Sequence, residues 1–354
     1  MPMEIADVFS GDAFSAVTLT DQINNTPYTP NLLGSLGNRL YAVDGVRTKE
    51  VAVNEKNGRL EIISTSPRGS APGQIDKPKQ NLNKKVDCSH LALEAEVNAD
   101  EVQNALNYAA SSGQPQLKVA QDVLTEQLEG PFGLRARFEL TMEYQRLGGI
   151  KGIVVDKDAS EIYNWYNYFG ISPMADGEFD LNTIDPDETK FEDFCRQLQR
   201  DMLVELEGLP TTNITALALC GDNYYDRAWG NKEVVSWRKA LLTGSGLSVF
   251  GTNKAFSSFT YGGIQFVNYR GTKDGDVGIG TDEARLFPVD CPGLFQMLFG
   301  PPDIMGMTNM KGLPLYAFMP PSRQTERLAV VEAQSNPLTM CIRPRALRRL
   351  AFAA

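Results

Sequence analysis

The chain has 354 residues, of which 42% are hydrophobic and 22% are charged, and its formal net charge is −10. This composition is typical of a folded protein with a large core, and it excludes a fibrous or largely disordered chain. The acidic balance argues against a protein that reads DNA sequence, since such proteins are usually basic or carry a basic stripe.

No stretch reaches the roughly 20 apolar residues that a membrane helix needs. The first 16 residues carry three acids and no basic residue, which does not suit a secretory signal, so we expect synthesis in the cytosol. The cysteines are odd in number and far apart, which predicts reduced, mostly buried thiols in place of a disulfide framework or a zinc site. They are Cys88, Cys195, Cys220, Cys291 and Cys341.

The N-terminal 45 residues hold one weak helical stretch, at 13–23, followed by the breakers Asn24-Asn25-Thr26-Pro27. Few apolar residues recur there at helical spacing. We therefore predict an extended arm over residues 1–45 that needs another surface to lie on.

Residues 46–97 read as a hairpin. Two β-rich runs, 46–53 and 59–65, flank Asn57-Gly58, a dipeptide typical of a hairpin turn. Residues 46–90 hold nine Lys/Arg and five Asp/Glu, a net charge of +4. Because this segment has little apolar surface to bury, we expect it to project from the body, on the order of 60 Å at about 3.3 Å per residue.

Helices are predicted over 100–110, 117–128 and 134–147. Gly130-Pro131-Phe132-Gly133 should interrupt the last two, because proline lacks the backbone donor, and Gly148-Gly149 should end the third. The runs 150–155 and 161–168 are predicted to pair as a second hairpin.

Residues 174–207 hold eleven Asp/Glu and three Lys/Arg, a net charge of −8, and Asp187 is a suitable N-cap for a helix over 188–207. A helix is expected over 222–242. Strands are expected at 214–220, 262–269, 284–288, 294–299, 315–319, 328–333 and 338–342. Ser335-Asn336-Pro337 should turn the chain between the last two strands, and residues 343–349 form a basic tail of net charge +4. The predicted fold class is α+β, with strands and helices partly segregated.

The sequence offers little catalytic chemistry. Its single histidine, His90, lies in the predicted hairpin, a poor place for a rigid nucleophile site or for a zinc site with three or four ligands. The acidic loops lack the glycine and glutamate of a calcium-binding loop, and Gly278-Ile279-Gly280 does not complete a GxGxxG motif. We predict no catalytic residue, no metal site and no cofactor, and hence no enzyme.

Charge is segregated into a basic hairpin, an acidic segment and a basic tail. If copies associate head to tail, the hairpin of one copy can lie over the acidic segment of its neighbour; the alternative is that all three are solvated faces. The residues expected to mediate assembly are Arg47, Lys49, Lys56, Arg59, Arg68, Lys77 and Lys79 in the hairpin, Asp185, Asp187, Glu188, Glu192 and Asp193 in the acidic segment, and Arg343, Arg345, Arg348 and Arg349 in the tail.

Several stretches, in the same order along the chain, resemble the phage lambda major capsid protein family (capsid protein E). They are FSAVTLT at 14–20, GSLG at 34–37, TSPRG at 65–69, DEVQ at 100–103 and EYQRLGGIKGIV at 143–154. The C-terminal part, 328–349, looks like the closing hairpin and basic tail of that family.

The resemblance implies the tailed-phage major capsid fold, named for phage Hong Kong ninety-seven. It places an N-terminal arm at 1–45, an extended E-loop at 46–97, a P-domain at 98–208 and 309–354, and an A-domain at 209–308. The spine helix of the P-domain would span 116–148, interrupted near 130–133.

The resemblance also implies a major capsid protein that self-assembles into hexamers and pentamers of an icosahedral shell around double-stranded DNA. Its partners would be copies of itself, a scaffolding protein, a portal and a decoration protein, with no membrane. It would be assembled in the bacterial host cytoplasm and end in the virion.

Two alternatives stay open. One is another phage structural subunit, such as a tail tube or decoration protein, which would form rings without closed shells. The other is a carboxylate-dependent hydrolase, since 44 acids always offer carboxylate pairs. The aromatic cluster at 163–169 could stack sugars or bases, although packing in the core of a strand is the preferred interpretation.

Overall fold

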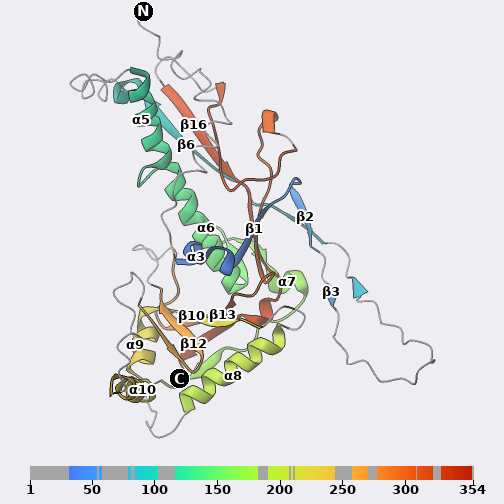
Figure 1. Cartoon of the computed structure of the whole chain (residues 1–354). Coiled ribbons are helices and arrows are strands. Elements are labelled where there is room, and N and C mark those ends of the chain that lie inside the picture. Colours follow the sequence, from blue (N-terminus) through green and yellow to red (C-terminus); the bar gives the residue numbers. More distant parts are fainter. Residues whose placement is uncertain are drawn as a thin grey trace, which may run out of the picture.

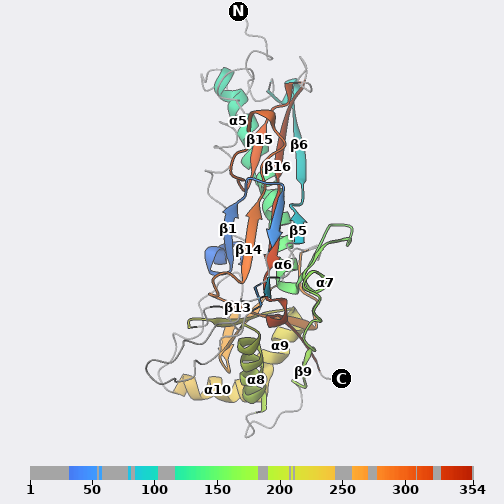
Figure 2. The same cartoon turned by 90° about the vertical axis from the view of Figure 1, so that its right-hand side faces the viewer.

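The computed structural model describes residues 32–53, 56–57, 79–80, 84–102, 116–181, 190–206, 209, 212–243, 257–269, 277–307, 309–321 and 328–352. They form an elongated α+β body (Figure 1), as the sequence predicts. A helix and a three-stranded sheet lie at one end, a second three-stranded sheet at the centre, and a six-stranded sheet with three helices at the other end (Figure 2). The predicted helix at 13–23 lies outside the described residues.

The central sheet has the order β1 (Tyr41–Gly45), β14 (Phe295–Phe299), β17 (Pro337–Cys341). β1 runs parallel to β14, and β17 runs antiparallel to it. Just before β1 come α3 (Leu32–Leu36) and the 3-10 turn η2 (Gly37–Arg39).

The prediction of a free arm is wrong for residues 32–45. Leu33, Leu40 and Tyr41 are buried in the core of their own chain, and β1 takes its hydrogen bonds from β14. Three large apolar side chains and one strand pairing suffice, although the stretch lacks the helical periodicity that would have shown the burial in the sequence.

The long central helix is divided in two, at the predicted place. α5 (Gln116–Glu129) ends where Gly130 N donates to Glu126 O at 2.8 Å, and α6 (Leu134–Lys151) begins after Gly133. The predicted end at Gly148-Gly149 is wrong, because α6 continues through both and ends at Gly152, whose φ is +78°. The two glycines serve close packing instead: a Cβ on Gly149 would lie 2.4 Å from Tyr41 Oη.

The three-stranded sheet beside α5 is antiparallel, in the order β15 (Tyr316–Phe318), β16 (Leu328–Ser335), β6 (Leu91–Asn98). The predicted turn between β16 and β17 is wrong, because the two strands belong to different sheets and only Asn336 separates them. Asn336 O accepts from Gly300 N at 2.8 Å, and its Nδ2 donates to Pro301 O at 2.6 Å. These two hydrogen bonds hold the backbone at Asn336 extended between the two sheets. The helix predicted at 100–110 is described only at its start, where residues 99–102 are helical.

The described part of the projecting hairpin consists of two strand pairs. β2 (Glu50–Val53) pairs with β5 (Lys84–Asp87), and β3 (Lys56–Asn57) pairs with β4 (Lys79–Gln80). The predicted turn at Asn57-Gly58 is therefore wrong, since Asn57 lies opposite Lys79 in the strand pairing. Pairing with a distant strand has overridden a local turn signal.

The six-stranded sheet has the order β11 (Ser258–Tyr261), β12 (Ile264–Asn268), β10 (Thr215–Cys220), β13 (Glu283–Val289), β18 (Arg348–Phe352), β9 (Gly177–Phe179). Around it lie α8 (Lys190–Glu205), α9 (Asp222–Gly230) and α10 (Lys232–Thr243). The predicted single helix over 222–242 is broken at Asn231, whose Oδ1 accepts from Glu233 N at 3.0 Å. The basic tail is also not free: after the 3-10 turn η5 (Pro344–Ala346) it becomes β18, paired on both sides.

The second predicted hairpin exists as β7 (Ile153–Val155) and β8 (Glu161–Asn164). Its second strand ends earlier than predicted, because Asn164 Oδ1 accepts from Asn167 N and starts the short helix α7 (Trp165–Phe169). The aromatic cluster does pack as core, with Trp165 1% exposed and stacked on Tyr163 at 5.6 Å, but its main contributor is a helix. The 3-10 turn η3 (Met305–Met307) lies between β14 and β15 along the chain. Within the described ranges, no helix has the length and apolar character to cross a membrane.

The contact between α6 and β1 gives a test of the core. Gly149→Ala should lower the melting temperature, because its Cβ would meet Tyr41 Oη at 2.4 Å and Thr339 Cγ2 at 2.9 Å. Overpacking of this kind costs about 1–3 kcal/mol. Gly230→Ala on α9 is the matched control, since a Cβ there meets nothing within 4 Å. In a Tyr41→Phe background the penalty should shrink; an unchanged penalty would refute the role given to Tyr41.

Candidate assembly surfaces

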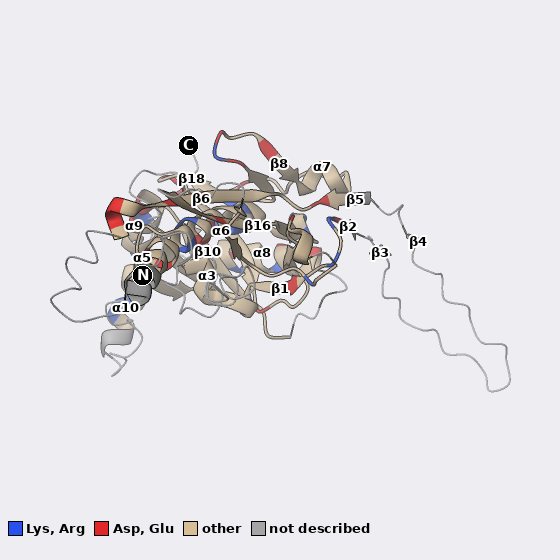
Figure 3. Ribbon diagram, turned by 90° about the horizontal axis from the view of Figure 1, so that it is seen from above, with Lys and Arg blue, Asp and Glu red and all other residues tan. Residues whose placement is uncertain are grey.

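Both ends of the projecting hairpin are held by backbone hydrogen bonds. On the incoming side, Val46 N donates to Phe299 O at 2.8 Å and Gly312 N donates to Val46 O at 3.0 Å. On the returning side, Ser89 N donates to Pro337 O at 3.1 Å. β3 and β4 lie beyond this root, away from the body (Figure 3), and each pairs only with the other among the described strands. The root is therefore fixed to the body of its own chain.

An acidic face lies on the sheet of β6 and β16. Glu332 stands directly opposite Glu94 in the antiparallel register, and Glu96 follows two residues later on the same face of β6. Glu94 and Glu96 are exposed and Glu332 is half-buried. These three carboxylates give this side of the sheet an acidic surface.

The acidic segment and the basic tail meet within one chain. Arg348 pairs with Asp201 at 2.6 Å, Arg345 with Glu205 at 3.1 Å and Arg349 with Asp176 at 3.0 Å. The sequence shows both charge runs but not their contact, because the parallel pairing of β18 with β9 joins segments about 170 residues apart. Three of the four tail arginines expected to mediate assembly thus have acidic partners in their own subunit.

The other residues expected to mediate assembly are placed as follows. Arg47 and Lys49 are exposed, Lys56 lies in β3, Lys79 lies in β4, and Arg343 is half-buried. Glu192 and Asp193 form the first turn of α8, where both pair with Arg196. Arg59, Arg68, Lys77, Asp185, Asp187 and Glu188 lie outside the described residues. Among the described residues, no hairpin cation forms an ion pair with the acidic segment.

Two buried glutamates, which the sequence reading missed, each hold the start of a distant helix. The carboxylate of Glu143 accepts from Leu33 N at 2.9 Å and Gly34 N at 3.1 Å. The carboxylate of Glu233 accepts from Phe191 N at 2.9 Å and Glu192 N at 3.3 Å. A tyrosine hydroxyl also donates to each, Tyr269 and Tyr261 respectively.

Burial raises the pKa of Glu143, although the hydrogen bonds and Arg146 act in the opposite direction. Only its position inside the apolar run of α6 could have distinguished it from the other acids.

The residues considered for catalysis have structural surroundings. His90 Nδ1 lies 2.8 Å from Asn336 Oδ1, beside the junction of β16 and β17. All five cysteines are free and buried. Burial raises the pKa of the Cys88 thiol to about 11, which keeps it protonated and a poor nucleophile. In the part of the chain that the structure describes, no group of three or more His, Cys, Asp or Glu side chains could hold a metal ion.

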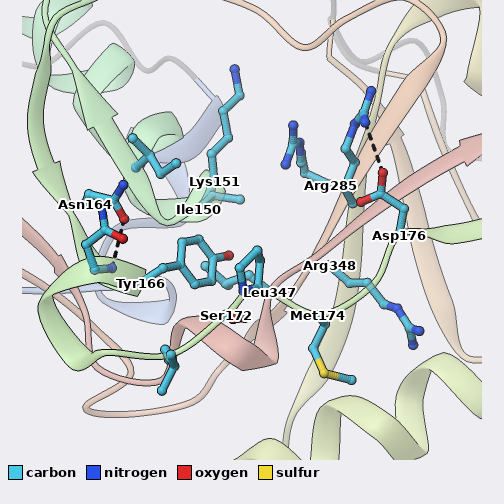
Figure 4. A pocket seen from close by; sticks show the side chains of 15 residues that line it. Ile150, Lys151, Asn164, Tyr166, Ser172, Met174, Asp176, Arg285, Leu347 and Arg348 are labelled. Carbon is cyan, nitrogen blue, oxygen red and sulfur yellow. Dashed lines mark hydrogen bonds and ion pairs between the residues drawn. The ribbon is translucent and has the colours of Figure 1, made fainter.

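A cavity of about 390 Å³ lies where the end of α6 meets β13 and β18 (Figure 4). Its charged lining residues are Lys151, Arg285, Arg348, Arg349 and Asp176. Beside the cavity, the carboxylate of Glu283 forms ion pairs with two arginines, Arg285 at 3.3 Å and Arg349. Burial alone would raise the pKa of Glu283, but the two arginines outweigh it and the net shift is downward.

Comparison with known proteins gives a consistent family. The profile of the family described as phage major capsid protein E matches residues 15–352. The major capsid protein of Salmonella phage Felix O1 (isolate Felix O1-VT1) is 21% identical, over 94% of this chain and 95% of its own length.

Solved structures include similar chains. One is from the capsid of Myoviridae phage XM1, with 13% identity, a TM-score of 0.47 and coverage of 93% of this chain and 95% of that one. Another is from the capsid of cyanophage A-1(L), with 12% identity, a TM-score of 0.47 and coverage of 92% and 95%.

The shared carboxylate of Glu283 predicts a pH dependence. Glu283→Gln should lower stability at pH 7 by about 1–3 kcal/mol, as expected when hydrogen bonds to charged groups are lost. Because the folded-state pKa is lowered, the stabilisation is present above 4.5 and is lost as pH falls through the folded-state value. The difference between wild type and variant, from urea unfolding at several pH values, should therefore narrow below pH 4.5. Asp226→Asn, at an exposed acid of α9, should show no such narrowing; a constant difference for Glu283→Gln would contradict the ion-pair role.

Proposed function

Because the chain belongs to the phage major capsid protein E family, we propose that copies of it assemble into hexamers and pentamers of an icosahedral shell around double-stranded DNA. The chain is a major capsid protein of a tailed phage with the tailed-phage capsid fold, and its place is the shell of the virion. The observation that carries the finer proposal is the hairpin. β3 and β4 stand off the body, and because an isolated two-stranded hairpin is only marginally stable, it would gain stability by packing on a neighbouring copy.

The proposed division is an arm at 1–45, an E-loop at 46–97, a P-domain at 98–208 and 309–354, and an A-domain at 209–308. The attachment of β2 and β5 at a fixed root supports the second of these. The six-stranded sheet links the last two, because β9 and β18 from the P-domain ranges join β10–β13. The buried part of the arm, 32–45, acts as an anchor to its own chain.

We propose that the basic hairpin of one copy docks on the acidic face of Glu94, Glu96 and Glu332 on the next. Three acids of the acidic segment first expected in this role, Asp176, Asp201 and Glu205, are instead paired by the tail of their own chain. A basic segment would complement the charge of the acidic face, and complementary charge also fixes the register of a contact. The many equal contacts of a closed shell make a weak individual contact sufficient.

The remaining partners follow from the family resemblance. We propose assembly in the host cytoplasm with a scaffolding protein and a portal, a decoration protein on the outer face, and proximity to packaged DNA without specific binding. The net charge of −10 suits a container that does not adhere to its contents. We propose no catalytic role, because His90 is hydrogen-bonded to Asn336 and the five thiols are buried.

Shortening the hairpin tests the assembly proposal. Val53 lies opposite Lys84, so residues 54–83 can be replaced by Asn-Gly, a two-residue turn that fits this register. The variant should keep the circular dichroism and melting temperature of the wild type but form no shells in negative-stain electron microscopy. The full chain, produced identically, is the control. Normal shells from the shortened chain would overturn the role of the hairpin.

Neutralising one acid of the acidic face should change assembly and leave folding nearly unchanged. Glu332→Gln should shift the free energy of unfolding by no more than about 0.5 kcal/mol, as is usual for surface substitutions. Assembly should weaken, and its yield should depend less on salt than that of the wild type, because a screened contact has been lost.

The matched control for the acidic face is Asp226→Asn, which changes the charge equally on an exposed face of α9. Light scattering of assembly across ionic strengths measures the second effect. Equal assembly of Glu332→Gln and wild type would exclude this face.

A further inference from the structure

The cavity at the end of α6 holds more positive than negative charge. Four cations, Lys151, Arg285, Arg348 and Arg349, and one acid, Asp176, line it. Arg348 is turned away from the cavity (Figure 4) and bound to Asp201. The cavity lies where three separate parts of the fold meet, namely α6, the segment before β9, and the pair β13–β18.

The carboxylates present do not satisfy these cations. Glu283 and Asp176 are both engaged by Arg349, and Glu283 also by Arg285. Arg285 Nε is buried and has no hydrogen-bond partner in the structure. A buried donor without an acceptor is unfavourable, so an acceptor that reaches this group would stabilise the folded chain.

Lys151 shows the same deficit. Its ammonium donates to Gly278 O at 3.2 Å, and no carboxylate among the described residues forms an ion pair with it. Burial, and then the nearby charge of Arg285, lower its pKa. Figure 4 shows Lys151 and Arg285 on the same side of the cavity. Two neighbouring cations with unused donors need an anion with several acceptor oxygens.

We propose that this cavity is a binding site for a phosphate-type oxyanion, held between Lys151 and Arg285. Its volume of about 390 Å³ admits such an ion together with ordered water. The apolar walls formed by Ile150, Tyr166 and Leu347 lower the local dielectric and strengthen the charge pairing. The bound ion ties the end of α6 to β13 and β18 and so stabilises the junction between the central helix and the six-stranded sheet.

The source of the oxyanion is free phosphate and not the backbone of DNA. Lys151 and the Nε atom of Arg285 are largely covered by protein, and the phosphates of a rigid duplex reach exposed cations far more readily than covered ones. A short duplex at equal phosphate concentration therefore serves as the second arm of the test.

The first experiment measures the melting temperature of the full chain against sodium phosphate, with sodium chloride at the same ionic strength as reference. Phosphate should raise the melting temperature saturably by a few degrees above chloride, since a ligand that binds only the folded state stabilises it. Lys151→Met should lose this increment and Lys151→Arg should keep most of it. Lys157→Met, at an exposed turn residue, should respond as the wild type does. The duplex should give no increment.

A second measurement needs no variant and so covers the case in which Lys151→Met does not fold. Acetylation by acetic anhydride, followed residue by residue with mass spectrometry, should slow several-fold at Lys151 when phosphate is present and should not change at Lys157. The proposal is overturned if phosphate and chloride act equally, if Lys151→Met keeps the increment, if the duplex alone gives it, or if Lys151 is not protected.

Discussion

The attachment of the hairpin root to the central sheet is the constraint on which the rest of the structure depends. β1 enters the sheet parallel to β14, Val46 continues its hydrogen bonding to Phe299, and Ser89 returns to Pro337. For β1 to lie there, Tyr41 must fit against α6, which only a glycine at 149 permits. Because the attachment uses backbone groups, it fixes where the hairpin leaves the body and leaves its outer strands available for contact with another surface.

Local chemistry made part of the fold predictable. Proline at 131 removes a donor wherever it stands, so the division between α5 and α6 follows from the sequence. Short, nearly continuous apolar runs likewise reveal β10 and β13. The sequence-based predictions that were wrong have another cause in common: the residues concerned contact partners that are distant in sequence. Asn57-Gly58 has the sequence of a turn, but Asn57 pairs with Lys79 of β4. Gly148-Gly149 has the sequence of a helix end, but the two glycines lie inside α6, where Val154 and Tyr41 pack closely against them.

The charged surfaces show the same limit. The sequence shows the sign and the extent of each charged segment. Whether that segment pairs within its own chain or with a neighbouring copy depends on the topology of the fold. β18 could have been a free tail; inserted between β13 and β9, it brings Arg345, Arg348 and Arg349 to the acids of α8 and Asp176. The acidic face of Glu94 and Glu332 appears only once β6 and β16 are paired in register, and the cavity beside Lys151 only once three segments converge.

The passage of β16 directly into β17 has a mechanical consequence. One stretch of backbone, with Asn336 as its only intervening residue, belongs to both the terminal and the central sheet. Tension between the two ends of the molecule runs along that stretch, and the hydrogen bonds to β6 and β14, which lie across the strand direction, are loaded in shear together instead of one at a time. The molecule therefore resists being stretched along its long axis without any covalent cross-link.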